Sequence, residues 1–331
     1  MKYESSNVTL SIGNGFLNYF YSRYLAGGST LGEARRISRR NLALAEVVQA
    51  PQYAHAIVLK EQIERFEKAV KLVKESKELS IELLCDINKT LTPEERRSGE
   101  VRSVQNWLGK SLETAYYLPP PPTELDSLLC KFINLINNST LPTKEKALLA
   151  YVNTQKIHTF ADGNGRTARA IYAGILAKEY DIHIPLSLYR LKVSPDYYYD
   201  FLRVQPINSE GIVSHDYLGE AYQWINNYEK EVAQQLIATQ KCISNKIGFS
   251  YMTAEDMDIV TLLWRYPVLT YETIKSHLNN NQKKAHDVIS TLSNCSILSA
   301  RKISYQTKTI YVAEDIFNCW DKLDNLMSDI K

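Results

Sequence analysis

The sequence lacks the features that would place a protein in a membrane, in an oxidising compartment or on a zinc ion. No run among its 331 residues approaches the roughly twenty apolar residues that a membrane-spanning helix needs. The N-terminus has no charged-then-apolar leader pattern. The five cysteines are scattered without the spacing of a zinc site, which predicts free thiols. These absences together predict a cytoplasmic protein without a membrane partner.

Net charge is also nearly absent. The 39 basic and 37 acidic residues leave a formal charge of +2 at pH 7, so no overall field draws the chain to nucleic acid. An apolar content of 44% and a charged content of 23% are ordinary for a globular protein. The length predicts roughly two domains, and no internal repeat or long low-complexity tract is visible.

What the chain does have is a dense polar stretch at residues 158–169, HTFADGNGRTAR. Glycines at 163 and 165 let successive backbone N–H groups turn inward and form a nest for an anion. Apolar residues then recur at three- and four-residue steps, which predicts a helix that begins at this turn. Its N-terminal N–H groups favour phosphate. Arg166 and Arg169, on one face of the first turn, favour a polyphosphate over a single phosphate.

A histidine stands at the start of this stretch and a carboxylate in its middle. His158 follows a second helical pattern and suits a general base, because a neutral imidazole can take a proton from an attacking hydroxyl. Asp162 suits Mg²⁺, which takes one or two carboxylates and completes its shell with phosphates and water. Each residue has an ordinary structural alternative, and the functional interpretation rests on their joint order. A phosphate-loop NTPase does not fit, since Arg166 stands where its lysine would.

The whole stretch resembles the signature of the Fic family, His-x-Phe-x-(Asp or Glu)-Gly-Asn-Gly-Arg-x-x-Arg, at every specified position. The resemblance implies transfer of a nucleoside monophosphate, usually AMP from ATP, to a Ser, Thr or Tyr hydroxyl of a target protein. It implies that His158 is the base and that Asp162 holds Mg²⁺. The residues that it places on the phosphates, from the inner to the outer ones, are Gly163, Asn164, Gly165, Arg166 and Arg169.

A second segment, residues 99–122, predicts a β-hairpin. Two short extended runs flank Gly109, and four consecutive prolines fix an extended exit. In isolation this is a surface hairpin, and the proline run could bind another domain. The segment resembles the Fic flap, which registers an extended target segment by strand addition. The flap residues predicted to dock the target are Asn106, Trp107, Leu108 and Gly109.

The N-terminal residues 1–80 are predicted to be helical and to carry a regulator. Residues 29–34 resemble the Fic inhibitory motif, (Ser or Thr)-x-x-x-Glu-(Gly or Asn), in which Glu33 would pair with Arg169 and displace the outer phosphate. Ala34 departs from that motif, and nearby glycines disfavour a helix. The alternative is a solvated Glu33 in a linker.

A tyrosine-rich run at residues 193–202 resembles the helix that packs behind the nucleotide in Fic folds. One of its tyrosines would face the adenine. Aromatic residues at helical spacing are also typical of a core, which is the alternative interpretation.

The C-terminal residues 251–331 are predicted to form a small α+β domain. Three helical patterns precede two β-rich runs, the arrangement of the winged helix that Fic proteins often carry here. Basic side chains within residues 279–312 favour binding of DNA. They are Lys283, Lys284, Arg301, Lys302 and Lys308. The domain as a whole is not basic, which favours a protein partner or a homodimer instead.

The predicted architecture is mainly α, a Fic-type helical core with a β-hairpin flap and a winged-helix appendage. The predicted segments are an N-terminal region at 1–80, the core at 81–230, a connecting helix at 231–250 and the appendage at 251–331. The predicted activity is AMP transfer from Mg-ATP to a target protein or to the chain itself. Two alternatives stay open: AMP removal or another nucleotide in the same site, and a DNA- or protein-binding regulator whose core only senses nucleotide.

Overall fold

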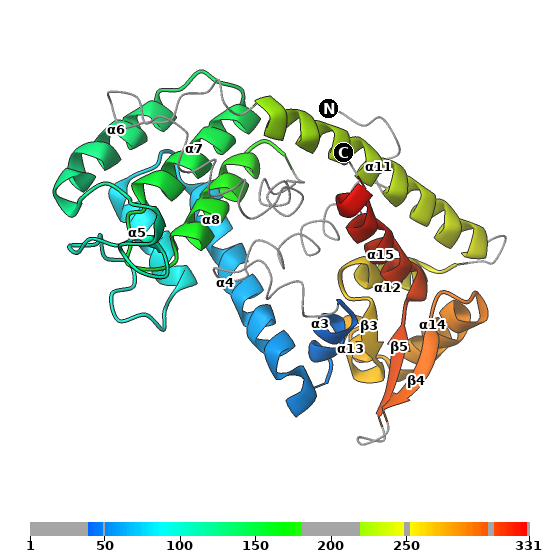
Figure 1. The fold of residues 1–331 in the computed structure, drawn as a ribbon. Helices are drawn as coiled ribbons and strands as arrows, with labels where there is room; N and C mark the ends of the chain where they lie inside the picture. The colour runs from blue at the N-terminus through cyan, green and yellow to red at the C-terminus, as the bar shows by residue number, and fades with distance from the viewer. Residues whose placement is uncertain (1–38, 49, 181–218, 248–251, 304–307, 330–331) are drawn as a thin grey trace. The chain divides into compact units, whose positions relative to one another are not determined.

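The computed structural model describes residues 39–48, 50–180, 219–247, 252–303 and 308–329 (Figure 1). These residues divide into two compact units. The core unit comprises residues 61–180 and 219–226, and the C-terminal unit comprises residues 39–60 and 227–329. The structure is mainly helical with two small sheets, which confirms the predicted fold class. Among the described helices, none has the length and apolar content to cross a membrane.

Helix α7 (Thr143–Ile157) lies at the centre of the core unit. It packs against α8 (Asn164–Leu176) and α6 (Leu125–Asn137), and α8 packs in turn against α5 (Ile81–Leu91) (Figure 1). The positions of α7 and α8 confirm the two helical patterns predicted on either side of the polar stretch.

The last three turns of α7 have no exposed face. Every residue from Ala147 to Ile157 is buried, although four of these eleven are polar. Polar side chains there bond back to the helix, as when Thr154 Oγ1 donates to the carbonyl of Ala150 at 2.8 Å. Because α7 is buried on all sides, it fixes the position of the residue that follows it, His158.

Glycine allows α8 to approach α4 (Ala54–Glu75) closely. A Cβ added at Gly174 would lie 2.3 Å from the Cβ of Val73 and 3.1 Å from the carbonyl oxygen of Val70. Atoms of a packed core cannot approach that closely, so any larger residue would push the two helices apart.

The predicted hairpin is present. Strands β1 (Leu108–Gly109) and β2 (Ala115–Tyr117) pair antiparallel, with Leu108 opposite Tyr117 and an irregular step at Gly109. The proline run then leads into the short helix η2 (Pro122–Glu124). We call residues 101–120 the flap.

The C-terminal unit contains all five elements that its sequence predicts. These are α12 (Ala254–Arg265), α13 (Tyr271–His277), α14 (Gln282–Asn294), β4 (Ser299–Ile303) and β5 (Lys308–Val312). Strand β3 (Val268–Thr270) and α15 (Glu314–Asp329) were not predicted, and β3 completes an antiparallel sheet of order β3-β5-β4. Three residues are too few for a period-two pattern, and β3 exists because β5 pairs with it.

The same unit includes further helices from distant parts of the sequence. These are α3 (Arg39–Ala45), η1 (Pro51–Tyr53), and portions of α4 and α11 (Gly219–Ile247). Helix α3 packs on α15, where Arg40 Nη2 lies 2.8 Å from Glu314 Oε2 and its guanidinium lies 4.4 Å from the Phe317 ring centroid.

The contact between α8 and α4 predicts the effect of Gly174→Ala. Alanine is favoured over glycine inside a helix by about 1 kcal/mol. The clash with Val73 should nevertheless dominate and lower the free energy of unfolding by about 1–3 kcal/mol, the usual cost of overpacking. Urea unfolding followed by circular dichroism measures the change. Gly165→Ala in the same helix is the control, because its added Cβ would meet the movable end of Arg169 at 3.3 Å. A stabilised Gly174→Ala would contradict the prediction.

Candidate active site

His158 caps the carboxyl end of α7 in the left-handed conformation, with φ 52° and ψ 56°. This conformation is uncommon for a residue with a side chain and persists where neighbours enforce it. The amide of His158 donates to the carbonyl of Thr154 at 3.2 Å, and its own carbonyl accepts from Arg102 Nε at 2.8 Å. The structure therefore places the histidine where the sequence predicts it, at the entrance to the Gly-Asn-Gly turn.

The imidazole of His158 is neutral near pH 7. Its side chain is buried, with 9% of the residue exposed, and this burial lowers its pKa to about 4. The charge of Arg102 lowers the pKa further, while the Gln155 carbonyl and Asp162 oppose the shift. Nδ1 lies 3.1 Å from the Gln155 carbonyl, which can only accept, so Nδ1 carries the hydrogen. Nε2 is left with a lone pair, as a general base requires.

Asn164 closes the loop that follows the histidine. Its Oδ1 accepts from the amide of Phe160 at 2.9 Å, and its Nδ2 donates to the Phe160 carbonyl at 2.7 Å. The Phe160 ring is buried, and Asn106 Nδ2 of the flap donates to the same carbonyl at 3.1 Å. Both polar ends of the Asn164 side chain thus have backbone partners, and its predicted contact with phosphate stays a prediction.

Gly163 starts α8 from a conformation that suits glycine, with φ 79°. A Cβ there would lie 2.6 Å from Thr92 Cγ2 and 2.8 Å from Asn88 Nδ2. The turn is therefore pressed against the end of α5, and the first N–H groups of α8 project from this point toward any bound anion.

The predicted metal and phosphate residues pair with one another. Arg166 Nη2 lies 3.1 Å from Asp162 Oδ2, and Arg166 Nη1 donates to the Leu91 carbonyl at 3.1 Å. Arg166 is also 3.6 Å from Glu94, which lies 2.9 Å from Arg65. The Arg166 side chain is 11% exposed and that of Asp162 is 54% exposed, so the carboxylate is the accessible member of the pair.

Arg169 takes a different course from Arg166. It is buried, and its Nη1 lies 3.3 Å from the place that a Gly165 Cβ would take, while Gln155 Nε2 of α7 lies 3.7 Å from the same place. The two arginines start on one face of α8, as the sequence predicts, but Arg166 reaches α5 and Arg169 lies beside α7.

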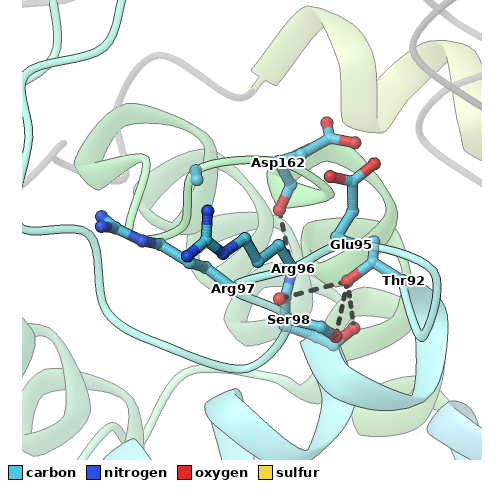
Figure 2. A pocket seen from close by; sticks show the side chains of 8 residues that line it. Thr92, Glu95, Arg96, Arg97, Ser98 and Asp162 are labelled. Atoms are coloured by element: carbon cyan, nitrogen blue, oxygen red, sulfur yellow. Dashed lines mark hydrogen bonds between the residues drawn. The ribbon is translucent and has the colours of Figure 1, made fainter.

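A polar pocket of about 200 Å³ opens beside Asp162 (Figure 2). Its lining comes from the end of α5, the turn after it and the loop before α8, and consists of Asn88, Thr92, Glu95, Arg96, Arg97, Ser98, Ala161 and Asp162. Figure 2 shows the carboxylates of Asp162 and Glu95 on one side and the two guanidinium groups on the other.

Asp162 could give a metal ion one carboxylate, and its binding of Mg²⁺ stays a prediction. The described ranges contain no group of three or more His, Cys, Asp or Glu side chains that could hold a metal ion. A cation at Asp162 would therefore take most of its ligands from phosphates and water, as Mg²⁺ usually does.

Asn88 is a site residue that the sequence analysis missed. Its Nδ2 donates to the Asp162 carbonyl at 3.0 Å and to Thr167 Oγ1 at 3.3 Å, and its Oδ1 accepts from the Gly99 amide at 2.9 Å. One buried amide thus joins α5, the loop before the flap and the start of α8. The available signal was an asparagine on the apolar face of an amphipathic helix, which is uncommon without a partner.

Arg102 was missed as well. This residue of the flap is 5% exposed and donates to carbonyls at the end of α7, including that of His158. No motif pointed to it, because its partners lie 55 and 56 residues away in the sequence.

The four flap residues predicted to dock a target lie in two different environments. Leu108 and Gly109 form β1, and Trp107 is 42% exposed. Asn106 instead turns toward Phe160. Glu33 and the tyrosine-rich run at 193–202 lie outside the described residues.

Several of the basic residues predicted to meet DNA have internal partners. Lys284 pairs with Glu255 and Arg301 pairs with Glu314, while Lys308 Nζ donates to the Val47 carbonyl at 3.4 Å. Binding of DNA or of a protein through residues 279–312 stays a prediction.

The contacts of Asn88 predict a large effect of Asn88→Leu. The apolar side chain would leave the Gly99 amide and the Asp162 carbonyl without this partner. Because both hydrogen bonds are part-buried, the free energy of unfolding is expected to fall by about 1–3 kcal/mol in total. Asn138→Leu is the control, since that exposed side chain donates to the Asn134 carbonyl of its own helix end and to no other described residue. Equal urea midpoints for the two variants would refute the role given to Asn88.

The burial of His158 predicts a pH dependence of stability. The folded imidazole titrates at about 4 and an unfolded histidine at about 6.5, so the unfolded state binds the proton first as the pH falls. Stability from this group is complete above about pH 6.5 and falls by about 3 kcal/mol toward pH 4. His158→Gln should lose this part of the slope in urea unfolding, whereas His55→Gln, at an exposed position of α4, should keep it. Identical slopes would contradict a buried neutral imidazole.

Comparison with known proteins agrees with the signature. Residues 78–176 match the Fic/DOC family. Similar solved structures include a Fic family protein from Desulfovibrio desulfuricans G20, at 14% identity over 94% of this chain and 97% of that one, with a TM-score of 0.42. A Fic domain containing signaling protein from Bacteroides thetaiotaomicron VPI-5482 has 19% identity over 68% and 86% of the two chains, with a TM-score of 0.48.

A third solved structure is that of residues 134–508 of Fic-1 from C. elegans, with 18% identity over 61% of this chain and 60% of that one and a TM-score of 0.40. The family is indicated by the match over residues 78–176 and by the signature at 158–169. The segment from α5 through the flap and α7 to α8, residues 78–176, is therefore a Fic/DOC family domain.

Proposed function

We propose that the Fic/DOC domain transfers AMP from Mg-ATP to a hydroxyl group of a target protein. Fic-domain proteins generally transfer nucleotide-derived groups to proteins, which makes this chain a Fic-type transferase in outline. The observation that carries the finer proposal is the contact of His158 Nδ1 with the Gln155 carbonyl, which leaves the lone pair of a neutral imidazole on Nε2.

The chemical step needs a base at this place. The acceptor hydroxyl gives its proton to Nε2 of His158 while its oxygen forms a bond to the α-phosphorus of ATP. The bond from that phosphorus to the bridging oxygen breaks, and pyrophosphate leaves with the electron pair. The negative charge of a bound triphosphate would raise the imidazole pKa from about 4 toward neutrality, which makes the base stronger when substrate is present.

The phosphates would lie at the amino end of α8. Its first N–H groups and its dipole favour the charge there, with Gly163 and Gly165 allowing a close approach of the backbone. Arg166 and Arg169 supply cations, and Arg166 has its donors engaged by Asp162 and Leu91 until a phosphate oxygen replaces the carboxylate.

Asp162 is the residue that would hold Mg²⁺, because its carboxylate is half-exposed and faces the polar pocket. A magnesium ion held there would neutralise phosphate oxygens and stabilise the pyrophosphate leaving group. The target would be registered along the flap, whose short two-stranded sheet and exposed Trp107 offer a surface for an extended segment.

The decisive measurement is the intact mass of acceptor proteins after incubation with Mg²⁺ and ATP, UTP or GTP in turn. We expect the chain itself or proteins of a lysate to gain one AMP with ATP. His158→Ala should reduce the rate by about 10²-fold or more, the usual contribution of a general base. His55→Ala, at an exposed site, should retain the wild-type rate. A uridylate or guanylate shift would change the donor, and ATP binding without any transfer would favour a nucleotide-sensing regulator.

A further inference from the structure

We propose that Arg102 is a positioning residue that holds the flap and His158 in one fixed register. The acceptor hydroxyl registered by the flap would then meet Nε2 of His158. This inference rests on the proposed function for its catalytic consequence, whereas its structural part stands on the contacts of Arg102 alone.

Arg102 grips the carboxyl end of α7. Its Nε donates to the His158 carbonyl at 2.8 Å and its Nη2 to the Ile157 carbonyl at 3.5 Å. Its backbone amide donates to the Thr159 carbonyl at 3.0 Å. Three successive carbonyls thus meet one arginine, and that of Ile157 belongs to the negative end of the α7 dipole.

The same guanidinium also donates to both sides of the flap, before β1 and after β2. Nη1 donates to the carbonyl of Val104, which precedes β1, at 3.4 Å. Nη2 donates to the carbonyl of Pro120, which follows β2, in a short hydrogen bond. A shift of either arm would therefore pull on the group that holds the backbone of His158.

Only an arginine can make this set of contacts. Its planar fork presents donors on three nitrogen atoms, whereas a lysine presents one compact ammonium group. In the part of the chain that the structure describes, the side chain of Arg102 meets carbonyl oxygens and no carboxylate. Its buried charge is thus free of an opposing acid and acts on the imidazole nearby.

Other contacts also hold the flap against the end of α7 and the loop that follows it. Each of them links one flap residue to one partner, whereas Arg102 bonds to several. Tyr117 Oη donates to the Lys156 carbonyl at 2.8 Å, and Asn106 Nδ2 donates to the Phe160 carbonyl at 3.1 Å. Val101 forms an isolated antiparallel bridge with Phe160. These contacts should keep the flap near α7 when Arg102 is replaced. We therefore expect the flap to lose its fixed position relative to His158 while the domain stays folded.

The test compares Arg102→Met and Arg102→Lys with Arg265→Met, a matched change at an exposed position of the C-terminal unit. Circular dichroism first establishes a temperature at which all variants are folded. Trypsin then reports the flap, because Lys110 lies exposed in the turn between β1 and β2. We expect cleavage after Lys110 to be about tenfold faster or more in Arg102→Met, slower than this in Arg102→Lys, and unchanged in the control.

Two further readouts separate positioning from a general loss of structure. The pKa of His158, followed by NMR titration, should rise in Arg102→Met, because a nearby positive charge is removed and the imidazole is less enclosed. In AMP transfer, kcat should fall by about 10²-fold while the Kd for Mg-ATP stays within about twofold, since misplacement of the reacting groups affects the chemical step.

The outcomes distinguish this inference from the proposed function. Unchanged cleavage and an unchanged His158 pKa in folded Arg102→Met would overturn the inference, whatever the activity. An equal loss of nucleotide affinity and kcat would reduce Arg102 to a structural residue and overturn it too. Faster cleavage and a raised pKa in a chain that transfers no nucleotide would support the anchoring role and refute the proposed function.

Discussion

The site depends on one constraint, the reversal of the chain between the end of α7 and the start of α8. Six residues, 158–163, connect two helices that are buried along almost their whole facing lengths. Both ends of the reversal use left-handed backbone, at His158 and at Gly163. Because neither helix can move without disrupting the core, the imidazole and the first N–H groups of α8 are held at a fixed separation. Preorganisation of this kind is what transfer to a phosphorus atom requires of a protein.

Buried polar side chains hold this reversal together, and they do so by satisfying backbone groups. Asn164 bonds to both polar atoms of the Phe160 backbone, and Asn88 bonds to the Asp162 carbonyl from outside the loop. Arg102 completes the set at the His158 carbonyl. A loop that carries unpaired backbone groups into a core would be unstable, so these three side chains are a condition for the loop's position.

Some charged side chains at the site form ion pairs with one another. Asp162 and Arg166 pair, and Glu94 links Arg166 to Arg65. A magnesium-bound triphosphate would bring a cation for the Asp162 carboxylate and anions for the Arg166 guanidinium. The single ion pair between these side chains could then be replaced by two, one with the metal and one with phosphate, and no charge would be left unpaired. The C-terminal unit also pairs charged side chains with one another, since Glu314 forms ion pairs with both Arg40 and Arg301. Internal pairing of this kind lowers the basic character that residues 279–312 show in the sequence.

The sequence by itself determined the features that arise within about twenty residues of one another. These include the helices on either side of the signature, the hairpin around Gly109, and α12, α13, α14, β4 and β5 of the C-terminal unit. They also include the order of residues that places a histidine before an anion-binding turn. Local periodicity and turn chemistry are sufficient for such features. The tertiary structure alone decided the partners of Asn88 and Arg102, the contact of Arg166 with the Leu91 carbonyl, and the pairing of β3 with β5. Asn88 and Arg102 bond to groups more than fifty residues away, so their roles follow from which segments the core packs together, and no local pattern records that.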